Sequence, residues 1–287
     1  MKTINNVITL LMLAGLAAGC IASQPALQIT PPQPTQTDTL RIYKDIPYTS
    51  TKLFDIYQPA ATGPHPLVLI LHGGGMNKER IMYLSRVVAQ LGAVVFTPTY
   101  SSGAPMPSYQ RITQGPEDAA CALRFAKAVS AQFDADPGRV LVIGHSAGGF
   151  VGADLALAGD EFHGDCLIDK GSALPDAFVG LDGAYDVVNC CIDSIRLEQA
   201  SRNEWDRIVP FTYIGHKPVH AGLAFFLVYG LEPELKDMAL AFAAALEAAG
   251  YPVTVSESPG TDHLLMTSPE SPGILSAIQQ ALALLKE

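Results

Sequence analysis

The stretch VLVIGHSAGGFVGADLAL, residues 140–157, joins an apolar run to a glycine-rich turn and then to a second apolar segment. The run is typical of a short buried strand, and the second segment is compatible with a helix. Between them, Gly144-His145-Ser146-Ala147-Gly148 fits the pattern G-x-S-x-G. A turn of this kind either presents Ser146 as a nucleophile or only packs a strand tightly against a helix. The strand and helix around it favour the nucleophile.

A nucleophile turn of this type has a physical reason for its glycines. The serine sits in a strained backbone conformation, and we expect side chains two residues away on either side to collide with it. The turn lifts the hydroxyl above the edge of the sheet. It also places the first N–H groups of the following helix where they favour negative charge.

Strand-like and helix-like segments alternate on both sides of this turn. We expect strands at 53–59, 66–75, 93–100, 139–144, 177–186, 224–230 and 253–258, and helices at 78–91, 117–133, 236–250 and 274–285. This alternation predicts an α/β fold, with a mostly parallel sheet covered by helices on both faces. Functional groups of such sheets gather beyond the carboxyl ends of the strands.

A second glycine-rich stretch, His72-Gly73-Gly74-Gly75, directly follows the apolar run PLVLIL. Backbone N–H groups stabilise an oxyanion only where the chain comes close to the substrate, which favours residues without side chains. We therefore assign the oxyanion donors to Gly74 and Gly75, joined by the N–H of Ala147. His72 is interpreted as a structural residue that holds this loop. The alternative is a flexible glycine turn.

Composition excludes one class of function. The chain has 287 residues, 48% of them hydrophobic and 16% charged, and a formal net charge of −10. Nucleic-acid binding needs concentrated Lys and Arg, and no basic run follows the N-terminus. We therefore expect no nucleic-acid partner.

The N-terminus has the features of an export signal. Lys2 precedes an apolar run, residues 7–18, that is short for a membrane span, and LAAGC then ends at Cys20. This ending resembles the bacterial lipobox, although Ala17 stands where Leu is preferred. We expect a signal peptide at 1–19, lipid on Cys20 and a flexible tether to residue 38, which would attach the protein to the membrane of a bacterial cell envelope. The alternative is a plain secretory signal.

The four remaining cysteines, Cys121, Cys166, Cys190 and Cys191, suggest disulfides in an exported protein, and they allow three pairings. A bond between the adjacent pair would be strained. We expect Cys166 to pair with Cys190 or Cys191, while Cys121 is equally consistent with a buried free thiol. A zinc site is not expected, because no second cysteine or histidine pair stands at ligand spacing.

Together, HGGG and GHSAGG resemble the esterase and lipase group of the α/β-hydrolase superfamily. The resemblance covers about residues 39–287 and extends to LFDIYQP, PEDAACALRF and GLDGAYD. It implies a serine hydrolase that acts on a small-molecule carboxylic ester without a metal or organic cofactor. Residues 187–223 would then form a cap region.

The resemblance also implies the order serine, acid, histidine along the chain. His263, in the loop after the last expected strand, is the candidate base. The acid is less clear, because related enzymes carry Asp a few residues after the strand where this chain reads GLEPELKD, residues 230–237. We place Glu232 first, then Asp182, since some α/β hydrolases carry the acid one strand earlier, and then Glu234.

The sequence is also compatible with two other functions. A non-catalytic member of the superfamily would use the fold as an envelope-tethered binding or scaffold protein, which the irregular acid loop would explain. An amidase or peptidase would differ only in the leaving group, and no sequence feature supports it.

Overall fold

A computed structural model describes residues 28–102, 112–190, 205–215 and 222–286. The expected signal peptide and Cys20 lie outside the described residues. Most of the expected tether and part of the expected cap region lie outside them as well. Within the described part of the chain, no helix is long and apolar enough to cross a membrane.

The core of the fold is a nine-stranded sheet in the order β1-β2-β3-β5-β4-β6-β7-β8-β9. Strands β1, β2, β3 and β5 pair antiparallel, whereas β5-β4-β6-β7-β8-β9 form a parallel array. Their bounds are Thr35–Gln36, Leu40–Pro47, Leu53–Pro59, His65–Leu71, Val94–Pro98, Ala135–His145, Ala177–Leu181, Ala224–Tyr229 and Val253–Glu257 for β1 to β9. The predicted, mostly parallel α/β sheet is confirmed.

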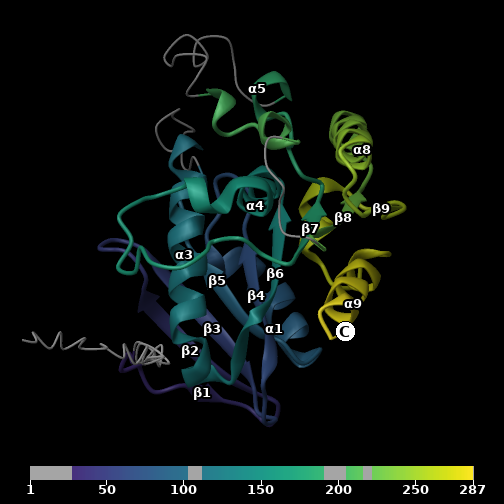
Figure 1. Ribbon diagram of the computed structural model, residues 1–287. Helices are drawn as coiled ribbons and strands as arrows, with labels where there is room; N and C mark the ends of the chain where they lie inside the picture. The colour runs from purple at the N-terminus through teal and green to yellow at the C-terminus, as the bar shows by residue number, and fades with distance from the viewer. Residues whose placement is uncertain (1–27, 103–111, 191–204, 216–221, 287) are drawn as a thin grey trace, which may run out of the picture.

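Helices cover both faces of the sheet (Figure 1). Successive strand residues belong to different cores, since Leu67 and Leu69 pack in one apolar cluster and Val68 and Ile70 in the other. This is expected for strands that are buried on both faces. The first cluster includes residues of α3 (Gly115–Val129), α4 (Ala147–Ala158) and α8 (Pro233–Ala248), and the second includes residues of α1 (Met82–Gln90) and α9 (Ile274–Leu284).

Short elements complete the fold. They are α5 (Val187–Cys190) and the 3-10 turns η1 (Lys78–Ile81), η2 (Ser130–Phe133), η3 (Gly159–Glu161), η4 (Pro210–Tyr213) and η5 (His263–Thr267). Two of them, η1 and η5, directly follow loops at the carboxyl edge of the sheet.

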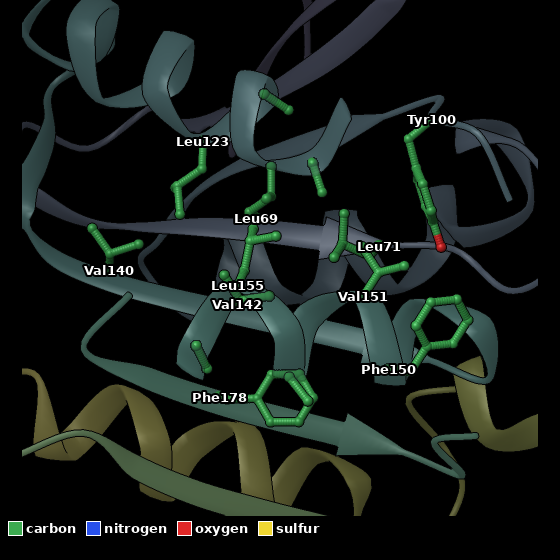
Figure 2. Packing of buried hydrophobic residues seen from close by; sticks show 14 of the residues in the cluster. Leu69, Leu71, Tyr100, Leu123, Val140, Val142, Phe150, Val151, Leu155 and Phe178 are labelled. Carbon is green, nitrogen blue, oxygen red and sulfur yellow. The ribbon is translucent and has the colours of Figure 1, made fainter. Parts of the chain in front are cut away.

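Helix α4 packs unusually close to the strands beneath it. Figure 2 shows Val151 and Leu155 of this helix beside Leu69, Val142 and Phe178 of the sheet. A Cβ on Gly152 would lie only 2.5 Å from the Phe178 ring. This close packing fixes the start of α4, and therefore fixes Ser146, against the centre of the sheet.

The disulfide differs from the prediction. Cys121 of α3 is bonded to Cys166, with their Cα atoms 4.9 Å apart, whereas we expected Cys166 to pair with Cys190 or Cys191. Cys121 is fully buried. Its place on α3 beside the long connection from α4 to β7 could not be deduced from cysteine spacing. The side chains of Cys190 and Cys191 lie outside the described part of the chain.

Candidate active site

Ser146 lies at the carboxyl end of the central strand β6, between His145, the last strand residue, and Ala147, the first residue of α4. Its backbone has φ 56° and ψ −117°, which is strained for a residue with a side chain. Three hydrogen bonds hold the turn: the N–H of Ser146 donates to the carbonyl of Leu181 at 3.0 Å, and its own carbonyl accepts from Gly149 at 2.8 Å and from Ala184 at 3.1 Å. The turn therefore has the strained strand-to-helix geometry of a nucleophile turn.

The flanking glycines are required by crowding, but the crowding differs from our expectation. A Cβ on Gly144 would lie 2.0 Å from the carbonyl oxygen of Gly148, and a Cβ on Gly148 would lie 2.4 Å from the carbonyl oxygen of Leu71. The collisions would involve backbone atoms and not the serine. These glycines therefore allow three backbone segments to meet beneath Ser146.

His263 faces the serine hydroxyl. It is the first residue of η5, and its Nε2 lies 2.9 Å from Oγ of Ser146. The carboxylate of Asp262 accepts the N–H groups of Leu264 and Leu265 and so caps this turn. The structure thus brings together the two residues that the sequence predicts as nucleophile and base.

Asp182 lies on the other side of the imidazole. Its Oδ2 is 3.1 Å from Nδ1 of His263, and its Oδ1 accepts the N–H of Gly230 at 2.7 Å. The side chain is fully buried. A carboxylate in this position requires a proton on Nδ1, so Nε2 is left with a lone pair that can accept the proton of the serine hydroxyl.

Our first choice for the acid, Glu232, is corrected by this geometry. Glu232 is the exposed residue before α8, where its carbonyl accepts the N–H of Lys236, and Glu234 is exposed in the first turn of that helix. The chain beyond β8 turns instead toward the His263 loop, since the N–H of Leu231 donates to the carbonyl of Thr261. Asp182, our second choice, therefore occupies the position against His263.

The glycine loop runs beside the nucleophile turn. A Cβ on Gly73 would lie 3.3 Å from Cβ of Ser146, and one on Gly74 would lie 3.6 Å from Cβ of Ala147. The N–H of Met76 donates to the carbonyl of Gly73 at 3.3 Å, which makes Gly74 and Gly75 the middle residues of a turn. Gly75 has φ 71°. Among the described residues, neither middle N–H has an acceptor, so both are available to a bound oxygen.

His72 holds the entrance of this loop, as expected from its place in the sequence. Its buried ring stacks on Tyr100 with 4.4 Å between ring centroids, and its carbonyl accepts the Tyr100 hydroxyl at 2.5 Å. Burial lowers the pKa of His72 to about 4. A neutral, fully enclosed imidazole of this kind acts as a fixed support.

His145, the residue before the serine, was not singled out from the sequence. Its Nε2–H donates to the carbonyl of His263 at 2.8 Å, which ties the end of β6 to the histidine loop. Burial, and next the neighbouring His263, lower the pKa of His145 to about 4, so it remains uncharged beside His263. Its place in the G-x-S-x-G motif was the available signal, because the residue before the serine must lie at the same sheet edge.

The described part of the expected cap region packs on the body of the protein. The ring of Phe211 meets that of Phe242 in α8 with 5.2 Å between centroids, and Tyr213 meets Phe162 at 5.9 Å. Trp205 is buried. His216 and His220, two histidines within the expected cap region, lie outside the described residues.

Comparison with known proteins agrees with this architecture. The chain superposes on esterase B from Lactobacillus Rhamnosis with a TM-score of 0.68 and 17% identity, over 90% of this chain and 89% of that one. The same enzyme is also known inhibited by a tributyrin phosphonate. Esterase 2 from Thermogutta terrifontis gives a TM-score of 0.65, 18% identity and 87% and 93% coverage. A truncated carbohydrate esterase from gut microbiota gives a TM-score of 0.67 and 16% identity, over 89% of this chain and 100% of that one.

These likenesses show the α/β-hydrolase fold. A comparison of the amino-acid sequence with curated proteins found no match. One family model does match it, the model described as BD-FAE, over residues 54–211. This match spans more than half of the chain and includes both glycine motifs, Ser146 and Asp182. The chain therefore belongs to the BD-FAE family.

Proposed function

We propose that this protein is a serine hydrolase that cleaves carboxylic esters through an acyl-enzyme on Ser146. One observation carries the proposal: a continuous chain of hydrogen-bond contacts from Oγ of Ser146 through His263 to the buried Asp182, at 2.9 Å and 3.1 Å. Nucleophile, base and orienting carboxylate stand in the order that serine hydrolysis requires. The esterases that share the fold support the same reaction.

In the proposed reaction, Oγ of Ser146 attacks the ester carbonyl carbon while Nε2 of His263 takes the hydroxyl proton. Asp182 accepts the Nδ1–H throughout and stabilises the imidazolium that forms. The carbonyl oxygen becomes an oxyanion, for which the N–H groups of Gly74, Gly75 and Ala147 are the proposed donors.

Collapse of this intermediate breaks the bond between carbon and the leaving oxygen. The imidazolium of His263 gives its proton to the departing alcohol, which leaves the acyl group on Ser146. Water then attacks the acyl carbon, with His263 again taking a proton. Collapse of this second intermediate breaks the bond between the acyl carbon and Oγ of Ser146, and the imidazolium of His263 returns its proton to Oγ, which releases the carboxylic acid and restores the serine. The residues named here supply every proton transfer in the cycle.

We also propose that the protein is exported and anchored by lipid on Cys20, with residues 20–38 as tether and 39–287 as the hydrolase domain. The short apolar run and LAAGC support this placement. Mass spectrometry of the protein from a bacterial membrane fraction tests it. Lipid on Cys20 is expected, and a mature chain that begins elsewhere without lipid would overturn it.

The alternative of a non-catalytic scaffold rested on the irregular acid loop, and Asp182 removes that reason by supplying the carboxylate from another strand. Hydrolysis of p-nitrophenyl acetate, butyrate and octanoate separates the two functions. We expect turnover by the wild type and a loss of at least about 10³-fold in Ser146→Ala. A folded wild-type protein that turns over none of the three esters would contradict the proposed function.

A further inference from the structure

The glycine loop, residues 72–77, has few side chains that could fix its own position. Gly73, Gly74 and Gly75 carry none, and a Cβ placed on Gly75 would meet no atom within 4 Å. The place of the Gly74 and Gly75 N–H groups is therefore set by the two ends of the loop. His72 on Tyr100 secures the entrance. The exit is Lys78, the first residue of η1.

The amino group of Lys78 is buried among three carboxylates. Its Nζ lies 2.8 Å from Oδ1 of Asp55, 2.8 Å from Oδ1 of Asp45 and 3.0 Å from Oε1 of Glu79. The lysine is only 5% exposed. Burial alone would lower the pKa of Lys78, but the hydrogen bonds to these carboxylates outweigh it and raise the pKa above its ordinary value. Lys78 is therefore a permanent cation at this point.

Asp55 is the fixed partner of this cation. It lies in β3, is fully buried, and accepts the N–H of Asp45 at 3.1 Å in addition to Lys78. Its second oxygen pairs with Lys44. Because β3 pairs with β5 within the sheet, the carboxylate of Asp55 is part of the rigid body of the fold. Without Lys78, Oδ1 of this buried carboxylate would keep only the N–H of Asp45 as a partner, which is unfavourable, so Lys78 is held firmly.

The edge of the sheet is deformed where it supplies Asp45, the second partner. The register of β2 on β3 shifts between Tyr43 and Ile46, and Asp45 between them has φ 58°. A bulge with a residue in the left-handed region costs free energy and re-aims a side chain. Here the side chain that it presents to Lys78 is a carboxylate.

We propose that Lys78 is a positioning residue, which, through Asp55 and Asp45, fixes the exit of the glycine loop and so aligns the oxyanion donors with Ser146. The inference rests on the proposed function. It predicts that loss of the Lys78 contact affects turnover more than substrate binding, because the donors act on the oxyanion and not on the ground-state ester.

The test compares Lys78→Met, Lys78→Arg and the double variant Lys78→Met/Asp55→Asn. In Lys78→Met, we expect kcat for p-nitrophenyl butyrate to fall about tenfold to a hundredfold with KM changed less than about threefold, since removing an oxyanion donor outright costs more. Affinity for butylboronic acid, whose tetrahedral adduct uses the same donors, should fall in parallel. Lys78→Arg should restore part of kcat.

The double variant separates positioning from simple stability. Removing both charges should recover much of the melting temperature lost in Lys78→Met, but kcat should stay low. Lys127→Met is the matched control, because the half-buried Lys127 also holds a protein oxygen with its amino group, the Leu174 carbonyl at 2.7 Å, but away from the glycine loop. It should lower the melting temperature and leave kcat within about twofold, as usual for an independent site.

Two results would overturn the inference. One is a Lys78→Met protein that folds and keeps kcat within twofold of an active wild type. The other is a double variant in which kcat recovers together with stability. If Lys78→Met does not fold, the double variant decides the question: a folded double variant with kcat within twofold of the wild type overturns the inference, and a low kcat supports it. An inactive wild type would refute the proposed function itself, which is a separate outcome.

Discussion

At the scale of single residues, the decisive feature is the place of Asp182. The register of β6 on β7 pairs His145 with Leu181, so the next residues along the two strands are Ser146 and Asp182. Like Ser146, Asp182 has a positive φ, 46°, where the strand ends. Two strained residues at adjacent strand ends therefore present the hydroxyl and the carboxylate to the same imidazole.

Replacing Asp182 with Asn should reduce kcat for p-nitrophenyl butyrate by about 10³- to 10⁴-fold while the protein stays folded. The amide keeps an acceptor for Gly230. Its NH₂ group, however, would donate to Nδ1 of His263, which moves the proton to Nε2 and removes the acceptor for the serine hydroxyl. Steady-state kinetics with circular dichroism as a folding check measure this effect.

Glu232→Gln is the matched control for this substitution. It also replaces a carboxylate with an amide, but at the exposed position before α8. We expect kcat within about twofold of the wild type, as is usual for surface substitutions. The reverse pattern, with activity lost in Glu232→Gln and kept in Asp182→Asn, would refute the assignment of the acid.

The sequence allowed Ser146 and His263 to be chosen because each follows a recognisable motif or strand. The acid was misplaced because GLEPELKD resembles the usual acid loop only in its position along the chain. The contact that decides it joins Asp182 and His263, which are 81 residues apart. Strand register sets such a contact, and a single sequence does not reveal register.

At the scale of elements, the backbone of α4, which follows β6 and the Ser146 turn, packs very close to the backbone at the end of β4. Gly148 belongs to α4, yet a Cβ on it would lie 2.4 Å from the carbonyl oxygen of Leu71 and 2.8 Å from that of His72. These carbonyls belong to the end of β4 and the start of the glycine loop. The same close approach that excludes side chains brings the proposed oxyanion donors to the serine.

Gly148→Ala should therefore lower the free energy of unfolding by about 2–3 kcal/mol, although alanine is normally the better helix residue. Urea unfolding followed by circular dichroism measures the change. The control is Gly138→Ala in the same strand–helix unit, where the nearest neighbour is a side-chain oxygen of Asp136 at 3.3 Å. A cost at Gly148 no larger than at Gly138 would contradict the crowding explanation.

Most elements follow from local pattern, and the exceptions have physical reasons. The seven expected strands form β3 to β9, and the predicted helices form within a few residues of their expected ends. Strands β1 and β2 were not predicted, because they form the antiparallel edge and lack a continuous apolar run. The strand expected over 177–186 ends at Leu181, where Asp182 takes its positive φ.

At the scale of the whole molecule, buried titratable groups of opposite effect set the dependence of stability on pH. Burial lowers the pKa of His72 and His145 to about 4. In the unfolded chain these histidines bind protons below about pH 6.5, whereas in the folded protein they do so only near pH 4. The folded state is therefore fully stable with respect to these groups above pH 6.5 and loses stability as the pH falls toward 4. Asp154, in α4, acts in the opposite direction, since burial raises its pKa well above the ordinary value.

Asp154 gives a specific prediction. Its two carboxyl oxygens are buried and have no hydrogen-bond partner among the described residues. The folded protein therefore favours the protonated acid, and stability is lost as the pH rises from the ordinary carboxyl pKa through the raised one. Asp154→Asn cannot ionise. It should be more stable than the wild type at pH 8 by at least about 1 kcal/mol, and this advantage should shrink toward pH 4.

Thermal unfolding of both proteins between pH 4 and pH 8 measures the difference directly. Comparing the two proteins cancels the contribution of the buried histidines, which they share. A difference in stability that stays constant with pH, or grows toward acid, would contradict the raised pKa of Asp154.

Labelling with a fluorophosphonate, followed by mass spectrometry of the modified peptide, shows whether Ser146 is a nucleophile activated by His263 and Asp182. We predict one adduct per chain on the peptide that contains Ser146, no adduct in Ser146→Ala, and labelling slowed by at least about 10³-fold in Asp182→Asn. A folded wild-type protein that stays unlabelled at Ser146, or that is labelled equally fast without Asp182, would contradict the account.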